Sequence, residues 1–197
     1  IRPEEFTGNF LLESVTIPES VKHIGEHAFA NCKNLSEVII SDNVFNIDCG
    51  AFSNCESLGE IFIPNSVTNI GADAFYGSKN LNKINISNKV VILEKGVFGG
   101  CENLNEITIP YGMINIGDGA FEECKSLREV SIPDNVASIG DYAFWNCQSL
   151  NQITVWSNVT SIGYSAFDGC KNLTIRAFKG SYVKRYALEN EIPFEEI

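Results

Sequence analysis

Apolar side chains recur along this chain at a fixed interval of 23 residues. The segments at 32–52 and 55–75 are nearly the same, and the repeated unit reads C-x-x-L-x-x-I-x-I-P-x-x-V-x-x-I-G-x-x-A-F-x-x. Leu occupies one column, at Leu12, Leu35, Leu58, Leu81, Leu104, Leu127, Leu150 and Leu173. Phe occupies another, at Phe29, Phe52, Phe75, Phe98, Phe121, Phe144 and Phe167. A period of this length is typical of stacked units that bury their apolar faces against one another.

Each unit divides into three short elements. The portion L-x-x-I-x-I alternates apolar and polar positions, which predicts a strand with alternate side chains turned inward. Pro ends that strand in several units, and V-x-x-I predicts a second extended piece. We expect the A-F-x-x-C portion to form a single helical turn. The glycines at this boundary, Gly25, Gly71, Gly117, Gly140 and Gly163, are expected to take a positive φ.

The two ends depart from the period. Residues 1–11 predict a partial or capping unit, residues 12–172 the regular repeats, and residues 173–197 a C-terminal cap, all within a single solenoid of residues 1–197. Residues 181–190 predict a short helix with Ser181 as its N-cap. The final segment, IPFEEI, adds a candidate edge strand.

These columns resemble the leucine-rich repeat, and specifically its 23-residue BspA-like class from bacterial and some protozoan surface proteins. Residues 127–147 are similar to that pattern almost letter for letter, and residues 179–196 resemble the ending of many such proteins. The resemblance implies a right-handed solenoid with a concave parallel sheet, short second strands and helical turns on the other side. It also implies an adhesion or protein-binding role and transfers no catalytic residue. The sequence departs from the pattern at Asp48-Cys49, Ser78, Leu93-Glu94 and Trp156.

The outward positions of the strands form columns that a ligand can reach. One column is mostly carboxylate, and exposed Ile39 and Phe62 lie on adjacent strands of another. The candidate binding residues are Glu37, Ile39, Glu60, Phe62, Lys83, Asn85, Glu106, Thr108 and Glu129. Two interpretations stay open: a solvated face whose charge is partly compensated by Lys83 and Arg128, or a site for a basic partner.

The net charge of −11 and the lack of clustered Lys and Arg argue against nucleic-acid binding. No apolar run approaches the roughly 18 residues of a membrane span, so we expect no membrane insertion by this chain. The expected partner is a protein or glycan, such as a host or matrix protein with a basic surface. The expected location is extracellular or at the cell surface.

Other candidate chemistry is weak. Six of the seven cysteines fall in a core column, which favours buried free thiols, whereas Cys49 lies near a turn and is the candidate reactive thiol. The only histidines, His23 and His27, are not arranged as a metal-binding H-E-x-x-H motif. We expect no catalytic residues, no metal and no cofactor.

The favoured hypothesis is therefore a non-enzymatic binding or adhesion module that engages a protein or glycan with its concave sheet. The alternative hypothesis is a structural spacer or stalk within a larger surface protein, in which other domains make the contacts. The identity of the ligand, the organism and the oligomeric state stay open.

Overall fold

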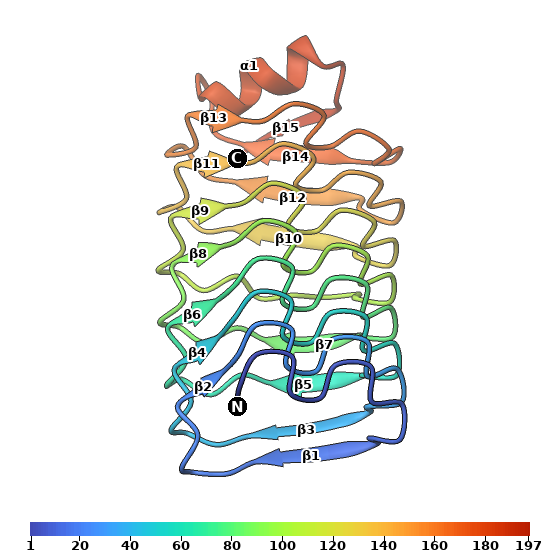
Figure 1. The fold of residues 1–197 in the computed structure, drawn as a ribbon. Helices are drawn as coiled ribbons and strands as arrows, with labels where there is room; N and C mark the ends of the chain where they lie inside the picture. Colours follow the sequence, from blue (N-terminus) through green and yellow to red (C-terminus); the bar gives the residue numbers. More distant parts are fainter.

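The computed structural model describes residues 1–197 and shows a column of stacked coils (Figure 1). Most coils place a longer strand on one side and a two-residue strand on another, joined by turns. The longer strands are β1 (Ser14–Ile17), β3 (Glu37–Ile40), β5 (Glu60–Phe62), β7 (Lys83–Asn85), β10 (Glu129–Ile132), β12 (Gln152–Val155), β14 (Thr174–Ala177) and β15 (Phe194–Glu196). The shorter ones are β2 (His23–Ile24), β4 (Asn46–Ile47), β6 (Asn69–Ile70), β8 (Ile92–Leu93), β9 (Asn115–Ile116), β11 (Ser138–Ile139) and β13 (Ser161–Ile162).

All strand pairs are parallel, and the pairing follows the period of the sequence. In β1 and β3, Val15 lies opposite Val38, one 23-residue unit later. The longer strands form ladders β1-β3, β5-β7 and β10-β12-β14-β15, and the shorter strands form β2-β4-β6 and β13-β11-β9-β8. The parallel repeat solenoid expected from the sequence is thereby confirmed.

The apolar columns form one continuous core. The Phe rings stack from Phe6 to Phe167 with centroids 5.1–5.7 Å apart and planes inclined by 2–22°. The Leu column is buried from Leu35 onward, and alternate strand residues such as Val38 and Ile40 point inward. Because each ring contacts the ring of the next coil, the core also sets the register between units.

The segment after the short strand differs from the single helical turn that the sequence predicted. Ala28 donates to the carbonyl of Gly25 (3.1 Å) within its own coil, but Phe29 donates to Ala51 (2.8 Å) in the next coil. This alternation continues through the segment and leaves no run of i→i−4 bonds. Two residues four apart, here His27 and Asn31, have a positive φ of 52° and 60°. The segment is a series of tight turns because alternate N–H groups bond between coils.

The sequence analysis expected the boundary glycines to have a positive φ, and this expectation was wrong. None of Gly25, Gly71, Gly117, Gly140 and Gly163 has a positive φ. A Cβ on Gly71 would instead lie 2.5 Å from the backbone nitrogen of Cys49 in the preceding coil. Glycine is needed here because the backbones of neighbouring coils approach closely.

The column cysteines are buried free thiols, as predicted. Each thiol donates to the carbonyl of a Phe in the preceding coil at 3.1–3.3 Å, and Ser78 takes the same role with its hydroxyl. Burial raises the pKa of Cys101 and Cys124, which favours the neutral thiol. Cys49 is free and exposed, and its reactivity stays a prediction.

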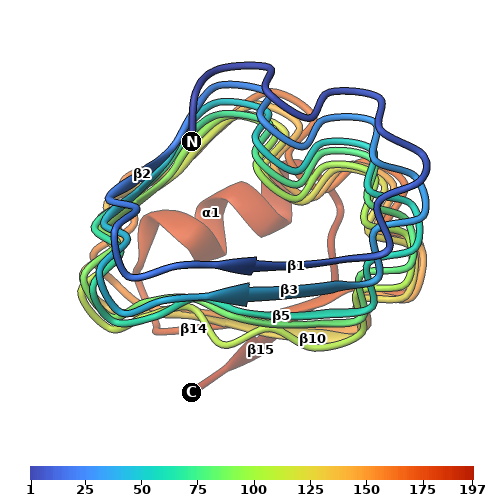
Figure 2. The same cartoon turned by 60° about the horizontal axis from the view of Figure 1, so that its bottom comes forward.

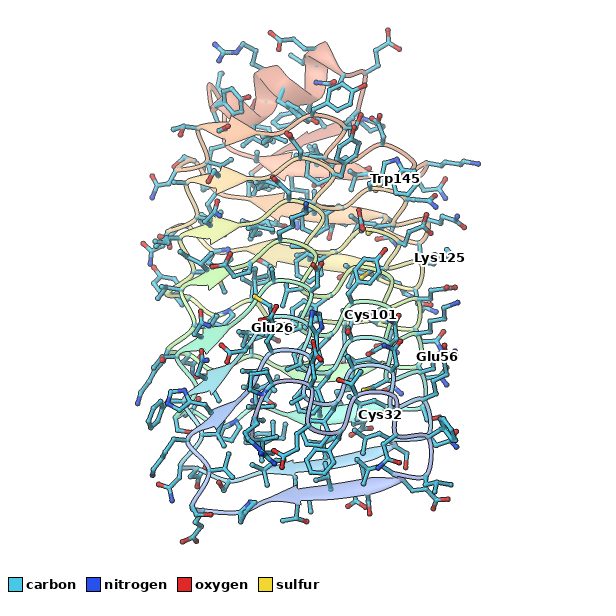
Figure 3. All side chains as sticks on the ribbon, viewed as in Figure 1. Glu26, Cys32, Glu56, Cys101, Lys125 and Trp145 are labelled. Carbon is cyan, nitrogen blue, oxygen red and sulfur yellow. The ribbon has the colours of Figure 1, made fainter.

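One edge of the column carries charges of alternating sign, which we call the charge ladder. It comprises Lys33, Glu56, Lys79, Glu102 and Lys125, each 23 residues after the last. The nitrogen-to-oxygen distances are 2.9 Å for Lys33–Glu56, 3.6 Å for Lys79–Glu102 and 3.1 Å for Lys125–Glu102. Figure 3 shows Glu56 and Lys125 on the same edge of the stack.

The C-terminal segment covers the last coil, as predicted. Helix α1 (Tyr182–Glu189) begins after Ser181, whose hydroxyl accepts from the backbone N–H of Lys184 at 3.2 Å. The helix lies across the end of the column (Figure 2), where it buries Val183 and Ala187. The predicted edge strand is β15, which pairs with β14. No helix in the structure has the length and hydrophobicity needed to cross a bilayer.

Candidate functional site

The longer strands present the polar columns that the sequence predicted. Glu60 lies opposite Lys83, Phe62 opposite Asn85, Asn85 opposite Thr108, and Glu106 opposite Glu129. Eight of the candidate residues are exposed, namely Glu37, Ile39, Glu60, Phe62, Lys83, Glu106, Thr108 and Glu129. The strand face therefore brings the candidate residues onto one surface.

Asn85 differs from the other candidates because its side chain is already engaged. Its amide oxygen accepts from the N–H of Ile63, and its amide nitrogen donates to the carbonyl of Ile63, both at 3.0 Å. Asn85 is only partly exposed. We therefore assign Asn85 to the structure of the sheet rather than to ligand contact.

The strand face has a break between β3 and β5 and a longer interruption between β7 and β10, where one coil has no longer strand. Residues 104–110 form no strand and make only two isolated bridges, at Glu106 and Thr108. No backbone N–H of residues 105–109 donates a hydrogen bond to the backbone, and none of their carbonyls accepts one. Ile107 is only partly buried, whereas Ile84 and Val130 in the same column are buried.

A hollow of about 680 Å³ lies at this interruption. Six of the nine candidates line it: Phe62, Lys83, Asn85, Glu106, Thr108 and Glu129. The other three, Glu37, Ile39 and Glu60, lie outside it, toward the N-terminal end of the column. The structure thus places most of the candidate residues around one concave feature.

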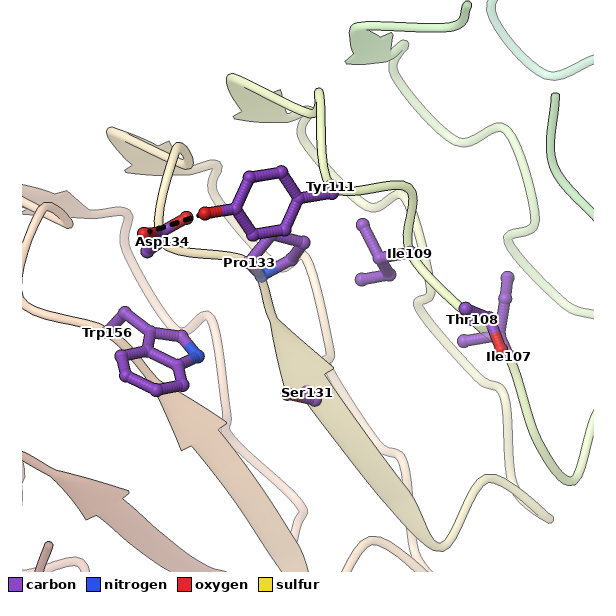
Figure 4. Close-up of a pocket in the computed structure, with 8 residues that line it drawn as sticks. All are labelled: Ile107, Thr108, Ile109, Tyr111, Ser131, Pro133, Asp134 and Trp156. Atoms are coloured by element: carbon purple, nitrogen blue, oxygen red, sulfur yellow. Dashed lines mark hydrogen bonds between the residues drawn. The ribbon is translucent and has the colours of Figure 1, made fainter. Parts of the chain in front are cut away.

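A second hollow of about 450 Å³ adjoins the first and shares Ile107 and Thr108 with it. Figure 4 shows these two residues at one end, and Tyr111, Asp134 and Trp156 at the other. We call this second hollow the aromatic hollow. Tyr111, Asp134 and Trp156 come from three successive coils, each just after the strand segment of its repeat.

The chemistry of the aromatic hollow centres on Asp134. The hydroxyl of Tyr111 donates to Oδ2 of Asp134 at 3.1 Å. This hydrogen bond and the negative charge of the carboxylate raise the pKa of Tyr111. The other carboxylate oxygen, Oδ1, is buried without a hydrogen-bond partner. Trp156 packs on Phe178 with ring centroids 5.4 Å apart and is 38% exposed.

Sequence reasoning missed Tyr111 and Asp134 but identified Trp156 as a departure from the repeat. A signal was present, because Tyr111 and Asp134 are one 23-residue period apart and Trp156 replaces the Pro found at 110 and 133. The interruption itself has no such signal. Residues 105–110 (NEITIP) follow the same pattern as residues 128–133 (REVSIP), which do form a strand.

On the strand face Arg176 of β14 pairs with Glu195 of β15 at 3.0 Å, but the charges among the candidate residues are not paired. None of the ion pairs in the structure involves Glu37, Glu60, Glu106, Glu129, Lys83 or Arg128. Arg128 lies in a polar hollow with Asn82, Asn103, Asn105, Ser126 and Ser149. The candidate carboxylates Glu37, Glu60, Glu106 and Glu129 are therefore available to a cationic partner.

Comparison with known proteins identifies the repeat. The BspA type leucine-rich repeat region matches residues 1–93 and 68–195, in six copies. A search of curated protein sequences finds no match.

Several solved structures are similar to this chain. A leucine-rich cell surface protein from Faecalibacterium prausnitzii is 26% identical with a TM-score of 0.50, and the alignment covers 95% of this chain and 65% of that one. A leucine-rich repeat protein from Bacteroides ovatus is 27% identical with a TM-score of 0.61, covering 90% and 58%. The leucine-rich repeat protein of T. pallidum is 28% identical with a TM-score of 0.60, covering 99% and 78%. The chain thus spans less than two thirds of the first two relatives.

Proposed function

Because the chain belongs to the BspA-type leucine-rich repeat family, we propose that it is a non-catalytic binding or adhesion module of a surface protein. Its ligand is a protein or a glycan that contacts the strand face. The surface location is supported by the F. prausnitzii relative, which is described as a cell surface protein.

The observation that carries this proposal is the interruption between β7 and β10. The ladder of longer strands also breaks between β3 and β5. Between β7 and β10, however, a whole coil lacks a longer strand, and two adjoining hollows open there on the face that carries the unpaired carboxylates. Polar, charged and aromatic groups surround an apolar floor there, an arrangement typical of binding sites. The nine candidate residues remain candidates for ligand contact, with Asn85 in a supporting role.

The negative face favours a partner with a basic surface. Glu37, Glu60, Glu106 and Glu129 contribute four negative charges, which attract positively charged partners and speed their association. Exposed Ile39 and Phe62, at 52% and 66% exposure, add apolar contact area beside them.

The test reverses the four carboxylates together, in the variant E37K/E60K/E106K/E129K. The control is E26K/D168K/E189K/E191K, whose four positions are exposed and lie outside the strand face. Each variant replaces four negative charges by four positive ones, so both raise the net charge by 8, from −11 to −3. Wild type and both variants are assayed against immobilised extracellular-matrix proteins and a glycan array.

We expect wild type and control to share a ligand that the strand-face variant no longer binds. Equal binding by both variants would place the site on another face. The alternative function, a spacer, is favoured by the Phe stack and the charge ladder, which hold the coils in a regular column. A wild-type protein without any ligand in these assays would support that alternative.

A further inference from the structure

We propose that the aromatic hollow binds an arginine side chain carried by a basic segment of a partner protein. This inference rests on the proposed function and deepens it, because it names the chemistry that the partner presents. The structure supports it through the side chains around Asp134 and the charge of the surrounding surface.

The backbone of residues 105–109 borders the hollow. It lies between β7 and β10, to which it makes isolated parallel bridges at Thr108 and Glu106, and its N–H groups make no backbone hydrogen bonds of ordinary geometry. Because Ile107, Thr108 and Ile109 line the hollow, their amides can report on a ligand bound there.

The side chains of the hollow fit a guanidinium group. Asp134 lines the hollow and is in none of the ion pairs of the protein, so a guanidinium in the hollow meets a carboxylate whose charge no cation of the chain neutralises. The Tyr111 hydroxyl holds one carboxylate oxygen and thereby fixes the carboxylate. The rings of Tyr111 and Trp156 line the same hollow, and aromatic faces attract arginine.

The charges around the aromatic hollow favour a ligand that brings a single positive charge close to Asp134. Glu106 and Glu129 lie in the adjoining hollow, and neither is in an ion pair. The only cation lining the two hollows is Lys83, in the larger one, next to Phe62. A single arginine placed near Asp134 avoids Lys83, whereas a run of arginines would bring like charges together.

The experiment measures peptide binding through the fluorescence of Trp156. The chain has two tryptophans, so a Trp145→Phe background leaves Trp156 as the only one. The probes are a capped seven-residue peptide with one central arginine and the same peptide with citrulline, which has a similar shape but no charge. Maltohexaose is the neutral glycan probe.

The decisive variant is Asp134→Asn, and the matched control is Asp42→Asn. Asp42 occupies the same repeat position four coils earlier and is exposed. Thermal unfolding verifies that each variant is folded. We expect the arginine peptide to bind about tenfold or more tightly than the citrulline peptide, because a charged hydrogen bond is lost with citrulline. Asp134→Asn removes that difference, and Asp42→Asn keeps it.

Hydrogen exchange gives an independent measurement on the same complex. We expect the amides of residues 105–109 to exchange more slowly when the arginine peptide is bound. Equal affinity for arginine and citrulline peptides, or an unchanged preference in Asp134→Asn, would overturn the inference. A Trp156 response to maltohexaose with none to the arginine peptide would also overturn it, in favour of a glycan site.

The two proposals can fail separately. If the four-carboxylate variant loses a natural ligand while Asp134→Asn binds it like wild type, the strand face is the binding surface and the arginine site is wrong. If the strand-face variant keeps every ligand, the proposed function is wrong, whatever the peptide result.

Discussion

At the scale of single residues, the repeat is defined by how close neighbouring backbones come. At Gly71 the preceding coil passes so near that a methyl group would contact the backbone of Asp48 and Cys49. Asp48 and Glu94 occupy the same slot in two other coils, so the backbone there makes room for a side chain. The glycine column was visible in the sequence, but its cause is a contact between units, which no local φ preference reveals.

This contact predicts the effect of adding one carbon atom. Gly71→Ala is expected to destabilise the protein by about 1–3 kcal/mol, the usual cost of overpacking. Gly59→Ala is the control, since its Cβ would lie 3.7 Å from the Asn82 amide nitrogen, an ordinary contact. Its effect should stay within about 1 kcal/mol. Urea unfolding measures both, and equal midpoints would show that the coils can move apart at Gly71.

A second residue-scale prediction concerns Glu122 on the turn side. Burial, Asp73 and Glu123 together raise the pKa of this carboxyl above 4.5. The ionised form is therefore disfavoured in the folded protein, and its cost to stability is full at neutral pH and absent below about pH 4.5. Glu122→Gln should raise Tm at pH 7 and leave it unchanged at pH 4.

The control for Glu122 is Glu19→Gln, an exposed position with the same change in charge. Calorimetry across pH 4–7 compares the two variants with wild type. If the stabilisation by Glu122→Gln grew as the pH fell, the direction assigned to the pKa would be wrong.

At the scale of elements, the ladders between coils show how much the sequence can predict. The strands, the Ser181 cap and the β15 edge strand follow from alternation, capping and position, and the structure has them. The turn segments differ from the expected helical turn because their N–H groups bond to the next coil. The interruption at residues 104–110 could not be predicted, since its letters match those of β10.

The charge ladder is an element-scale feature, and only the 23-residue spacing of its residues reveals it in the sequence. Glu102 lies between Lys79 and Lys125, and the hydrogen bond from Lys125 lowers its pKa. Glu102→Lys would place three lysines in succession along the edge. We expect a lower Tm at low salt, and a smaller loss at about 0.5 M salt, because exposed charges are screened.

Two further variants interpret that result. Glu102→Gln removes the attraction without adding repulsion, so its Tm should be intermediate. Glu19→Lys makes the same change in net charge away from the ladder and should have little effect. A loss in Glu102→Lys that is independent of salt would mean that packing, not charge, explains it.

At the scale of the whole molecule, each coil contacts only its neighbours, so the ends decide how the column is closed. The core at the C-terminal end is covered by α1, where Val183 is fully buried and Tyr186 lies edge-on to Phe167 at 6.1 Å. Burial, as the largest cause, raises the pKa of Tyr186 to about 12. Stability in such a column is a sum over units and their interfaces, so damage at one end should fade with distance.

Val183→Asp tests this expectation, because a buried carboxylate without a partner is strongly disfavoured. We expect the cap to detach, and amide exchange to speed up in β12, β14 and β15 while β2, β4 and β6 keep wild-type protection. Leu188→Asp, on the same helix but 64% exposed, is the control and should leave exchange unchanged. If every coil of Val183→Asp lost the same protection against amide exchange, the column would unfold as one unit. That result would contradict the view that each coil is stabilised only by its neighbours. Graded loss would mean that the larger hollow, around residues 62–129, keeps its shape when the end of the column opens, whereas the aromatic hollow, whose Trp156 packs on Phe178, is disturbed.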